Sequence, residues 1–225
     1  MKVLINIIIF FFLTNQTIAK DNIMILKIKD GEIKIELFSD VAPNHVERIK
    51  TLANSGKYDN VVFHRVIDGF MAQTGDLKYG NSSSENFDLR KAGTGGSDLP
   101  DLKQEFSNIP HLRGTLSMAR SSDPNSANSQ FFICFQPAPF LDRQYTVFGK
   151  VVEGMEYVDQ IKRGDQNQNG SVENPDKIDD FNNLLIEMKA KKRRADEKKG
   201  KPPYRFVYCD EERMEQFEKE MRKKD

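Results

Sequence analysis

Residues 23–38 alternate apolar and polar side chains on both sides of an Asp-Gly pair. In the second half, the run 33–37 places three aliphatic side chains on one face and Lys34 and Glu36 on the other. This alternation has the period of a β-strand. Because Asp30-Gly31 between two such runs is typical of a tight turn, the sequence predicts an antiparallel β-hairpin here.

Short extended runs recur along the chain, and only two helical patterns interrupt them. The extended runs are 61–75, 114–119, 130–135 and 145–151. One helix is predicted over Pro43–Gly56, with Val46, Ile49, Leu52 and Ala53 on one stripe, and a short one over Met155–Lys162. Many short strands with few helices indicate a closed or nearly closed β architecture.

A long irregular region, 76–108, separates two groups of these runs and is rich in Gly, Ser, Asn and Asp. More than about thirty residues without periodicity are unusual inside a compact domain, and such regions are more often functional than idle. Within it, Gly93-Thr-Gly-Gly96 lacks the Lys-Ser/Thr of a phosphate-binding loop, so we expect a tight turn.

The N-terminal residues 1–19 have the pattern of a secretory signal peptide. Lys2 precedes an apolar run over 3–13, and a Thr-x-Ala sequence ends at Ala19. The run is shorter than the ~20 residues that span a bilayer. We expect cleavage after Ala19 and export, most simply to a periplasm, with no membrane span afterwards. The alternative is an uncleaved N-terminal membrane anchor.

Charge and cysteine content exclude several classes of protein. The chain has 34 Lys and Arg against 34 Asp and Glu, a net charge of zero. A protein that binds nucleic acid through phosphates usually has a basic surplus, so no nucleic-acid partner is expected. Two cysteines do not make a disulfide scaffold. Cys134 lies in an apolar run, so a buried thiol is expected rather than a disulfide with Cys209.

The character of the chain changes near Asp179. Phe181, Leu184, Leu185 and Met188 have the spacing of one helical stripe, and 189–201 is dense in Lys and Arg. A solvated helix face explains these charges better than a phosphate or lipid-headgroup contact. The predicted organisation is a signal peptide over 1–19, a folded domain over 20–178 and a charged, partly helical C-terminal extension over 179–225.

One predicted hairpin gathers unusual side chains around Arg65. A two-residue loop, Asp68-Gly69, would place Arg65 opposite Ala72, whereas a three-residue loop would place it opposite Gln73. The sequence leaves both registers open. A guanidinium stays protonated in proteins, so Arg65 can donate hydrogen bonds but cannot act as a general base. Taken alone, a single Arg on a strand is more often a surface ion pair.

Four blocks together resemble the cyclophilin-type peptidyl-prolyl isomerases in wording, order and approximate spacing. They are Phe63–Gln73 (FHRVIDGFMAQ), Gly114–Ala119 (GTLSMA), Ser129–Ile133 (SQFFI) and Val147–Val151 (VFGKV). The resemblance covers roughly residues 23–178. It implies a closed eight-stranded antiparallel β-barrel capped by two α-helices, and catalysis of cis/trans rotation about Xaa-Pro bonds without a cofactor.

The resemblance also implies a role for individual residues. Arg65 would be the catalytic residue, and the main chain of Ala119, Arg120 and Ser121 would hold the substrate backbone. The remaining substrate-binding residues would be Phe70, Met71, Phe132 and Leu141 around the proline, Gln73 and Gln130 as polar contacts, and Phe140 and Tyr145. No metal ligand is implied.

These residue types suit the reaction. Rotation about a peptide bond has a barrier of ~18–20 kcal/mol, because the twisted amide loses its resonance. The twisted proline nitrogen regains a lone pair, and a fixed donor aimed at it binds the transition state better than the ground state. Such a mechanism requires no nucleophile, metal or cofactor.

The sequence departs from the family pattern at four places. Phe140 occupies a position often filled by Trp, which the family uses to bind cyclosporin, so weak cyclosporin sensitivity with retained activity is expected. Tyr145 stands where eukaryotic members often have His and resembles the exported bacterial branch. The segment 119–130 is one residue longer than in the eukaryotic type, and 76–108 resembles an inserted loop bordering the groove.

Two weaker signals have simpler readings. Asp165–Asp176 imitates a calcium loop, but Pro175 stands where a helix should begin and the last ligand position is Asp, so an ordinary loop is favoured. His64 alternates to the strand face opposite Arg65, which favours a structural histidine over an acid or base.

We therefore expect a monomeric isomerase that acts on Xaa-Pro segments and assists the folding of exported proteins. The alternative is a non-catalytic module of the same fold that binds proline-containing segments. Arg65 with a complete pocket favours the enzyme, because binding alone does not require it.

Overall fold

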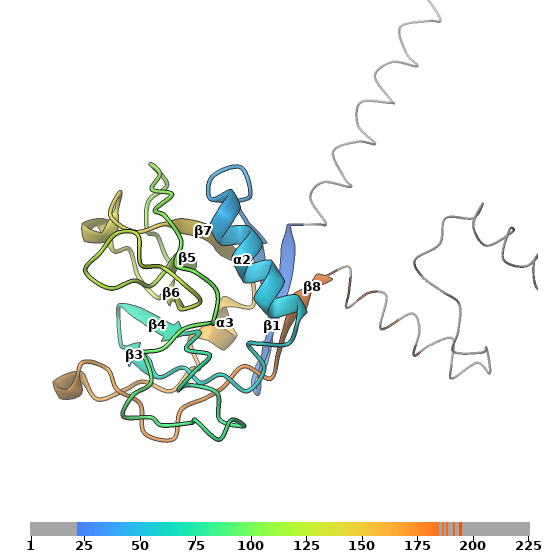
Figure 1. Ribbon diagram of the computed structural model, residues 1–225, viewed down its shortest axis with the longest axis vertical. Helices are drawn as coiled ribbons and strands as arrows, with labels where there is room; N and C mark the ends of the chain where they lie inside the picture. Colours follow the sequence, from blue (N-terminus) through green and yellow to red (C-terminus); the bar gives the residue numbers. More distant parts are fainter. Residues whose placement is uncertain (1–21, 185, 187, 189–190, 192–193, 195–225) are drawn as a thin grey trace, which may run out of the picture. The chain divides into compact units, whose positions relative to one another are not determined.

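The computed structural model describes residues 22–184 together with 186, 188, 191 and 194. Eight antiparallel strands form one curled sheet in the order β3-β4-β6-β5-β7-β2-β1-β8 (Figure 1). The strands are β1 Ile23–Ile28, β2 Gly31–Leu37, β3 Arg65–Ile67, β4 Met71–Thr74, β5 Thr115–Met118, β6 Phe131–Cys134, β7 Val147–Glu153 and β8 Asp180–Asn183. Within residues 22–183 the helices are α2 Pro43–Asn54 and α3 Met155–Val158, with 3-10 turns at Pro139–Leu141 and Gln166–Gln168.

The predicted first hairpin is confirmed. β1 and β2 pair from Ile23 opposite Glu36 to Ile28 opposite Gly31, so Asp30 lies in the turn. Ile33 and Ile35 are completely buried. The alternation in the sequence therefore identifies the buried face of β2 correctly.

The prediction of a closed barrel was wrong. β3 and β8 are the two edges of the sheet and do not pair with each other. Instead, the segments before them exchange backbone hydrogen bonds, from Asn60 N–H to Ile178 O (2.7 Å) and from Phe63 N–H to Asp176 O (2.8 Å). Asn60 has a φ of +65°, so its backbone is not extended, and the edge strands are only three and four residues long. The result is a half-barrel.

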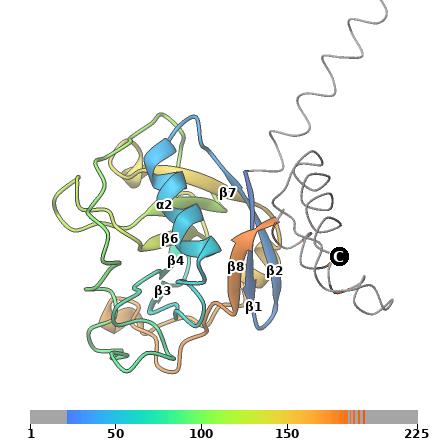
Figure 2. The same cartoon turned by 45° about the vertical axis from the view of Figure 1, so that its right-hand side comes forward.

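Helix α2 follows the predicted pattern, with Pro43 in its first turn and Val46, Ile49, Leu52 and Ala53 buried. It lies beside β8 (Figures 1 and 2), where Asn183 N–H donates to Asn54 Oδ1. The second helix is shorter than predicted. It ends at Val158, although Ile161 beyond it is also buried.

The segment after Asp179 forms a strand where a helical stripe was predicted. Phe181 lies in β8, which pairs with β1, and is completely buried. Leu184 and Met188 are helical, as expected, whereas Leu185 and the sequence beyond residue 194 lie outside the described residues. The spacing of Phe181 fits either period, and its burial against the sheet favoured the strand.

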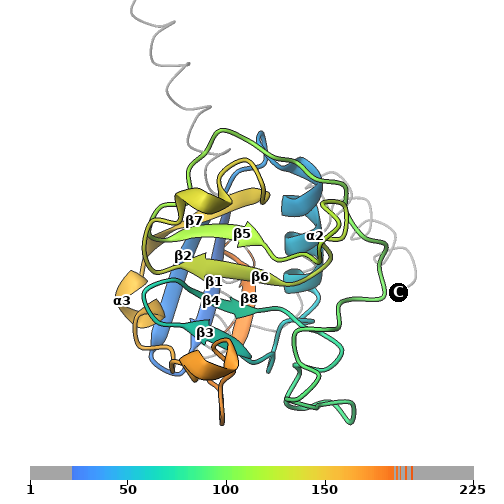
Figure 3. The same cartoon turned by 90° about the vertical axis from the view of Figure 1, so that its left-hand side faces the viewer.

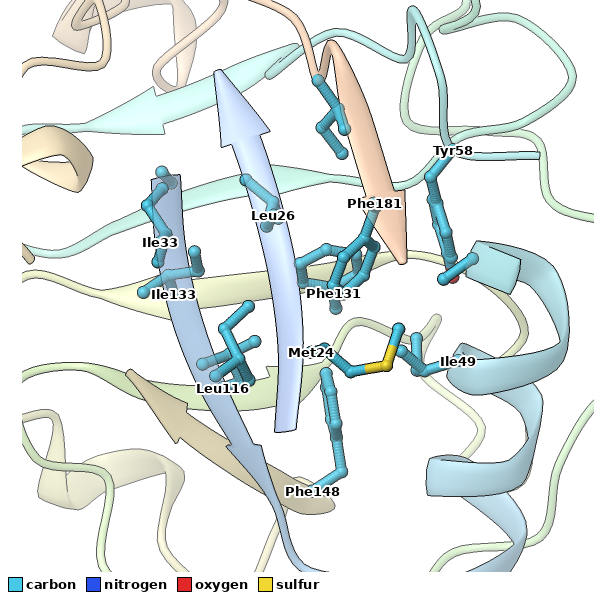
Figure 4. Packing of buried hydrophobic residues seen from close by; sticks show 14 of the residues in the cluster. Met24, Leu26, Ile33, Ile49, Tyr58, Leu116, Phe131, Ile133, Phe148 and Phe181 are labelled. Carbon is cyan, nitrogen blue, oxygen red and sulfur yellow. The ribbon is translucent and has the colours of Figure 1, made fainter. Parts of the chain in front are cut away.

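The core lies on the inner face of the curled sheet. Phe131 is at its centre, with ring contacts to Tyr58, Phe148 and Phe181 at centroid distances of 5.6, 5.9 and 6.1 Å (Figure 4). Strands β7, β5, β6, β4 and β3 lie side by side in Figure 3, and their inward side chains join this cluster. The opposite face of the same strands therefore remains available for a site.

Region 76–108 contains neither helix nor strand, as expected, apart from two isolated bridges, Asn81 with Val61 and Leu102 with Ala127. Within the described part of the chain, no helix combines the length and the apolar character needed to cross a bilayer.

Candidate active site

The β3–β4 hairpin decides between the two registers that the sequence left open. Arg65 lies opposite Gln73, and Ile67 lies opposite Met71. The loop therefore has three residues, 68–70, and Gly69 within it has a φ of +69°. Such a φ suits glycine, because it lacks the Cβ that would clash. The three-residue alternative is the correct one.

Strand alternation then gathers one set of side chains on the outer face. Gln73 pairs in register with both Arg65 and Phe132, and Met71 pairs with Cys134. Because side chains two residues apart share a face, all five point away from the core that contains Val66 and Ala72. The outer face of β3, β4 and β6 thus has a polar row that begins with Arg65 and Gln73, beside the apolar side chains of Met71, Phe132 and Cys134.

Arg65 is half-buried and fixed by three hydrogen bonds. Its Nε donates to Asn169 O (3.0 Å), Nη2 to Asn169 Oδ1 (3.0 Å) and Nη1 to Gln73 Oε1 (3.1 Å). A guanidinium has five N–H groups, so one on each terminal nitrogen is left to meet another molecule.

Burial lowers the pKa of the Arg65 guanidinium from its ordinary value, and interaction with Tyr145 opposes that shift. The group still carries its proton at neutral pH. Arg65 is therefore a permanent donor.

The polar row continues beyond Gln73. Its Nε2 donates to Gln130 Oε1 (3.0 Å), and Gln130 Nε2 donates to the carbonyls of Gly93 (3.0 Å) and Gly95 (2.7 Å). Gln130 is only 9% exposed. Each amide is thereby held with its oxygen toward the preceding donor, which orients Arg65 through Gln73.

An apolar pocket adjoins this row. Met71, Phe132 and Leu141 form a buried cluster with Cys134 and Ala138, and Phe70, Ala119 and Tyr145 pack against it. Phe132 meets the edge of Tyr145 at 6.0 Å. Phe140 is 62% exposed and contacts Phe70, with ring centroids 5.4 Å apart. The candidate pocket residues therefore lie together.

Arg120 and Ser121 lie beside this pocket. The Arg120 guanidinium stacks on the ring of Tyr145, 4.4 Å from its centroid, and its Nη2 donates to Gln144 O. Ala119, Arg120 and Ser121 also line a second, polar pocket of about 240 Å³, together with Gln73, Gly93–Gly95, Ser126, Asn128 and Gln130. Ser121 itself is exposed.

Sequence reasoning missed two residues that shape the site. His111 is completely buried behind Phe132, with the two rings stacked at 6.3 Å. Its backbone N–H and Nδ1 both bond Asp142 Oδ1, and its Nε2 bonds Ser117 Oγ. The N–H donors of His111 hold the pKa of Asp142 below its ordinary value.

Asn169 is the second missed residue. Its φ of +55° turns both its carbonyl and its side-chain oxygen toward Arg65. The only signal in the sequence was the Asn-Gly pair, which is typical of a tight turn rather than of a site.

The calcium-like loop does not gather its acidic side chains. Asp165 accepts from Asn167 N–H within its own turn, and Asp176 pairs with Lys29 at 2.7 Å. Among the described residues, no three His, Cys, Asp or Glu side chains are grouped as metal ligands would be.

Two other predictions concern buried groups. Cys134 is a free, buried thiol, and burial raises its pKa to about 12, which makes it unreactive. Cys209 lies outside the described residues. His64 is 6% exposed, so the prediction of a satisfied structural histidine is confirmed as to burial, but neither of its ring nitrogens has a hydrogen-bond partner among the described residues.

Comparison with known proteins gives the family. Residues 23–183 match the family model described as "Cyclophilin type peptidyl-prolyl cis-trans isomerase/CLD". The chain belongs to this family.

Curated relatives agree. The chain is 60% identical to a probable peptidyl-prolyl cis-trans isomerase of Brucella suis over 158 residues, which are 70% of this chain and 80% of the relative. A plant relative, from Arabidopsis thaliana and also named a peptidyl-prolyl cis-trans isomerase, is 42% identical over 59% of this chain and 56% of its own length.

Solved structures of cyclophilins resemble the fold. The Hirschia baltica cyclophilin AquaCyp293 has a TM-score of 0.62 and 26% identity, covering 74% of this chain and 75% of its own. A Cryptosporidium parvum cyclophilin, crystallised in the presence of the dipeptide Ala-Pro, has a TM-score of 0.59 and 28% identity, covering 71% and 96%. The activity of this chain is therefore peptidyl-prolyl cis-trans isomerisation.

Proposed function

We propose that Arg65 is the catalytic residue and that its two remaining N–H groups stabilise the twisted Xaa-Pro bond. The observation that carries this proposal is the fixation of its guanidinium by Asn169 and Gln73. When the amide twists, its nitrogen becomes a hydrogen-bond acceptor, which the planar ground state is not. A donor held in place in advance stabilises that state without reorganising.

The apolar pocket adjoining Arg65 receives the proline ring in this proposal. Met71, Phe132 and Leu141 supply its buried floor, and Phe70, Phe140 and Tyr145 its more exposed walls. An apolar ring is held there by loss of water contact. The proline ring stays fixed in this pocket, and the carbonyl of the residue before it rotates next to Arg65.

Gln73 and Gln130 orient Arg65 and contact the substrate, and the main chain of Ala119, Arg120 and Ser121 holds the substrate backbone. The second, polar pocket borders this segment. The substrates are Xaa-Pro segments of polypeptides. The use of Ala-Pro with the Cryptosporidium parvum cyclophilin supports this class of substrate.

We further propose that the protein acts after export, most simply in a periplasm, as a monomer that assists folding of other exported chains. The signal-peptide pattern of residues 1–19 supports export. Cleavage near Ala19 would release the folded domain, which includes β8 up to Asn183, together with the charged C-terminal extension that follows it.

The test is proline isomerisation of an Xaa-Pro peptide by residues 20–225, measured by NMR exchange. The parent should catalyse exchange strongly, and Arg65→Ala should lower kcat/KM by about a hundredfold, equivalent to ~2.7 kcal/mol of transition-state stabilisation. Arg113→Ala is the matched control, because Arg113 pairs with Asp159 away from the site and its loss should leave the rate unchanged.

The competing function is binding of proline-containing segments without turnover. A folded parent that binds the peptide but does not accelerate exchange would establish that alternative. Equal rates for the parent and Arg65→Ala would instead remove Arg65 from the mechanism while leaving the activity intact.

A further inference from the structure

Asp76 carries a buried carboxylate that the mechanism does not use directly. Its side chain follows strand β4 and is completely inaccessible to solvent. Four backbone N–H groups donate to it: those of Lys78 and Tyr79 to Oδ1 (3.0 and 2.9 Å), and those of Gly93 and Gly95 to Oδ2 (2.7 and 2.9 Å). Such a set of donors offsets the loss of water around a charge. The carboxylate thus joins two parts of the 76–108 loop.

The Gly93-Thr-Gly-Gly96 sequence is built around this carboxylate. Gly93 has a φ of +100°, a conformation that other residues rarely adopt. A Cβ at Gly95 would lie 2.5 Å from Asp76 Oδ1 and 2.8 Å from Lys78 Cβ. The glycines therefore allow the loop backbone to approach Asp76 closely enough to donate, which gives this motif a role other than phosphate binding.

The same two glycines point their carbonyls at the active site. Gly93 and Gly95 donate through N–H to Asp76 and accept through C=O from Gln130 Nε2. Gln130 then fixes Gln73, and Gln73 fixes Arg65. One continuous series of hydrogen bonds therefore runs from Asp76 to the Arg65 guanidinium.

We propose that Asp76 is a positioning residue for the isomerase: it fixes the Gly93 and Gly95 carbonyls, and through Gln130 and Gln73 it sets the orientation of Arg65. The inference rests on the proposed role of Arg65. Without the carboxylate, the two carbonyls lose their alignment, Gln130 is free to rotate its amide, and Gln73 no longer presents its oxygen to Arg65.

Asp76→Asn tests this with little change in shape. The new amide nitrogen is itself a donor, so it faces backbone N–H groups that it cannot satisfy. We expect kcat/KM to fall roughly tenfold, with altered side-chain NMR signals of Arg65 Nε–H and of the Gln73 and Gln130 amides. Asp88→Asn is the matched control: Asp88 caps Arg90 N–H in the same loop without bonding Gln130, so its loss should change the rate by less than about twofold.

A double-mutant cycle separates positioning from general loss of structure. If Asp76 acts through Gln130, Asp76→Asn should add less than about twofold to the defect of Gln130→Ala. A full tenfold loss in that background would overturn the proposal, as would unchanged kcat/KM in Asp76→Asn alone. If Asp76→Asn does not fold, Gly95→Ala, which pushes the carboxylate from its donors, enters the same cycle.

The outcome for Arg65 is read separately. If kcat/KM falls strongly in Arg65→Ala but is unchanged in Asp76→Asn, only the positioning role of Asp76 is contradicted. Equal activity of the parent and Arg65→Ala means that the proposed catalytic residue itself is wrong.

Discussion

The two faces of strands β3, β4 and β6 differ in what they do, although their residues alternate in the sequence. Phe131 and Phe132 are neighbours, and both are buried. Phe131 packs among the aromatic rings of the core, whereas Phe132 packs with Met71 and Leu141 beside Arg65. Successive side chains along a strand point to opposite faces, so alternate positions separate the core residues from those of the proposed site.

The largest expected effect is on the inner face. Phe131→Ala should lower the free energy of unfolding by about 3–5 kcal/mol, since it leaves a cavity among Tyr58, Phe148 and Phe181. Denaturant titration measures this change. The folded fraction should keep kcat/KM close to that of the parent.

Phe132→Ala is the matched substitution on the outer face. It should lower kcat/KM by at least about tenfold, because the proline pocket loses its floor. If both variants lose activity to the same extent once folding is corrected for, the separation of the two faces does not hold.

His64 and Arg65 are also sequence neighbours on opposite faces, and burial affects the protonation of His64. Burial lowers the pKa of His64 from 6.5 to about 4, although Asp76 opposes the shift. Between pH 6.5 and 4 the unfolded chain binds the proton more tightly, so stability falls as the pH drops and levels off below about 4. Over this pH range, protonation of His64 should lower the free energy of unfolding by about 3 kcal/mol.

The difference in unfolding free energy between the parent and His64→Gln isolates this contribution, because His45, whose pKa burial also lowers, is present in both. As the pH falls from 6.5 to 4, the parent should lose about 3 kcal/mol more unfolding free energy than His64→Gln. Parallel profiles would show that His64 takes up its proton equally in both states.

Asn169 offers a smaller effect confined to the outer face. Asn169→Gly keeps the positive φ and the backbone carbonyl but removes the side-chain oxygen that accepts from Arg65 Nη2. We expect kcat/KM to fall about tenfold, ~1.4 kcal/mol, with the thermal midpoint little changed. Unchanged kcat/KM would mean that Gln73 and the carbonyl suffice to hold the guanidinium.

The smallest expected effect on activity is at Phe140. Phe140→Trp should leave kcat/KM within about twofold while strengthening inhibition by cyclosporin, because the indole N–H adds a donor at an exposed wall of the pocket. An inhibition titration of both proteins measures this. Equal inhibition would show that Phe140 does not limit cyclosporin binding.

Much of the fold could be predicted from local pattern. The Ile33–Leu37 alternation and the stripe of α2 identify their buried faces because one period dominates each segment. The edge at β8 could not be predicted, since Phe181 fits both a strand and a helix until its partner β1 is known. Barrel closure also depends on how two distant short strands meet, which no local pattern records.

The candidate site likewise has residues that the sequence could name and residues that it could not. Arg65 and its pocket could be named from the family motifs, and the three-residue loop was one of two registers. Asn169 lies 104 residues from Arg65 along the chain, and its contribution depends on a positive φ in a turn. His111 likewise acts from behind Phe132. Such contacts arise from tertiary placement and leave little trace in sequence.

The most direct test of the central claim is Arg65→Lys, measured by NMR exchange beside the parent and Arg65→Ala. Lysine keeps the charge but lacks the planar set of donors that Asn169 and Gln73 hold in place. If catalysis depends on a fixed guanidinium with two N–H groups left for the substrate, Arg65→Lys should remain at least about tenfold below the parent in kcat/KM. Parent-like activity in Arg65→Lys would contradict this and show that a positive charge alone suffices.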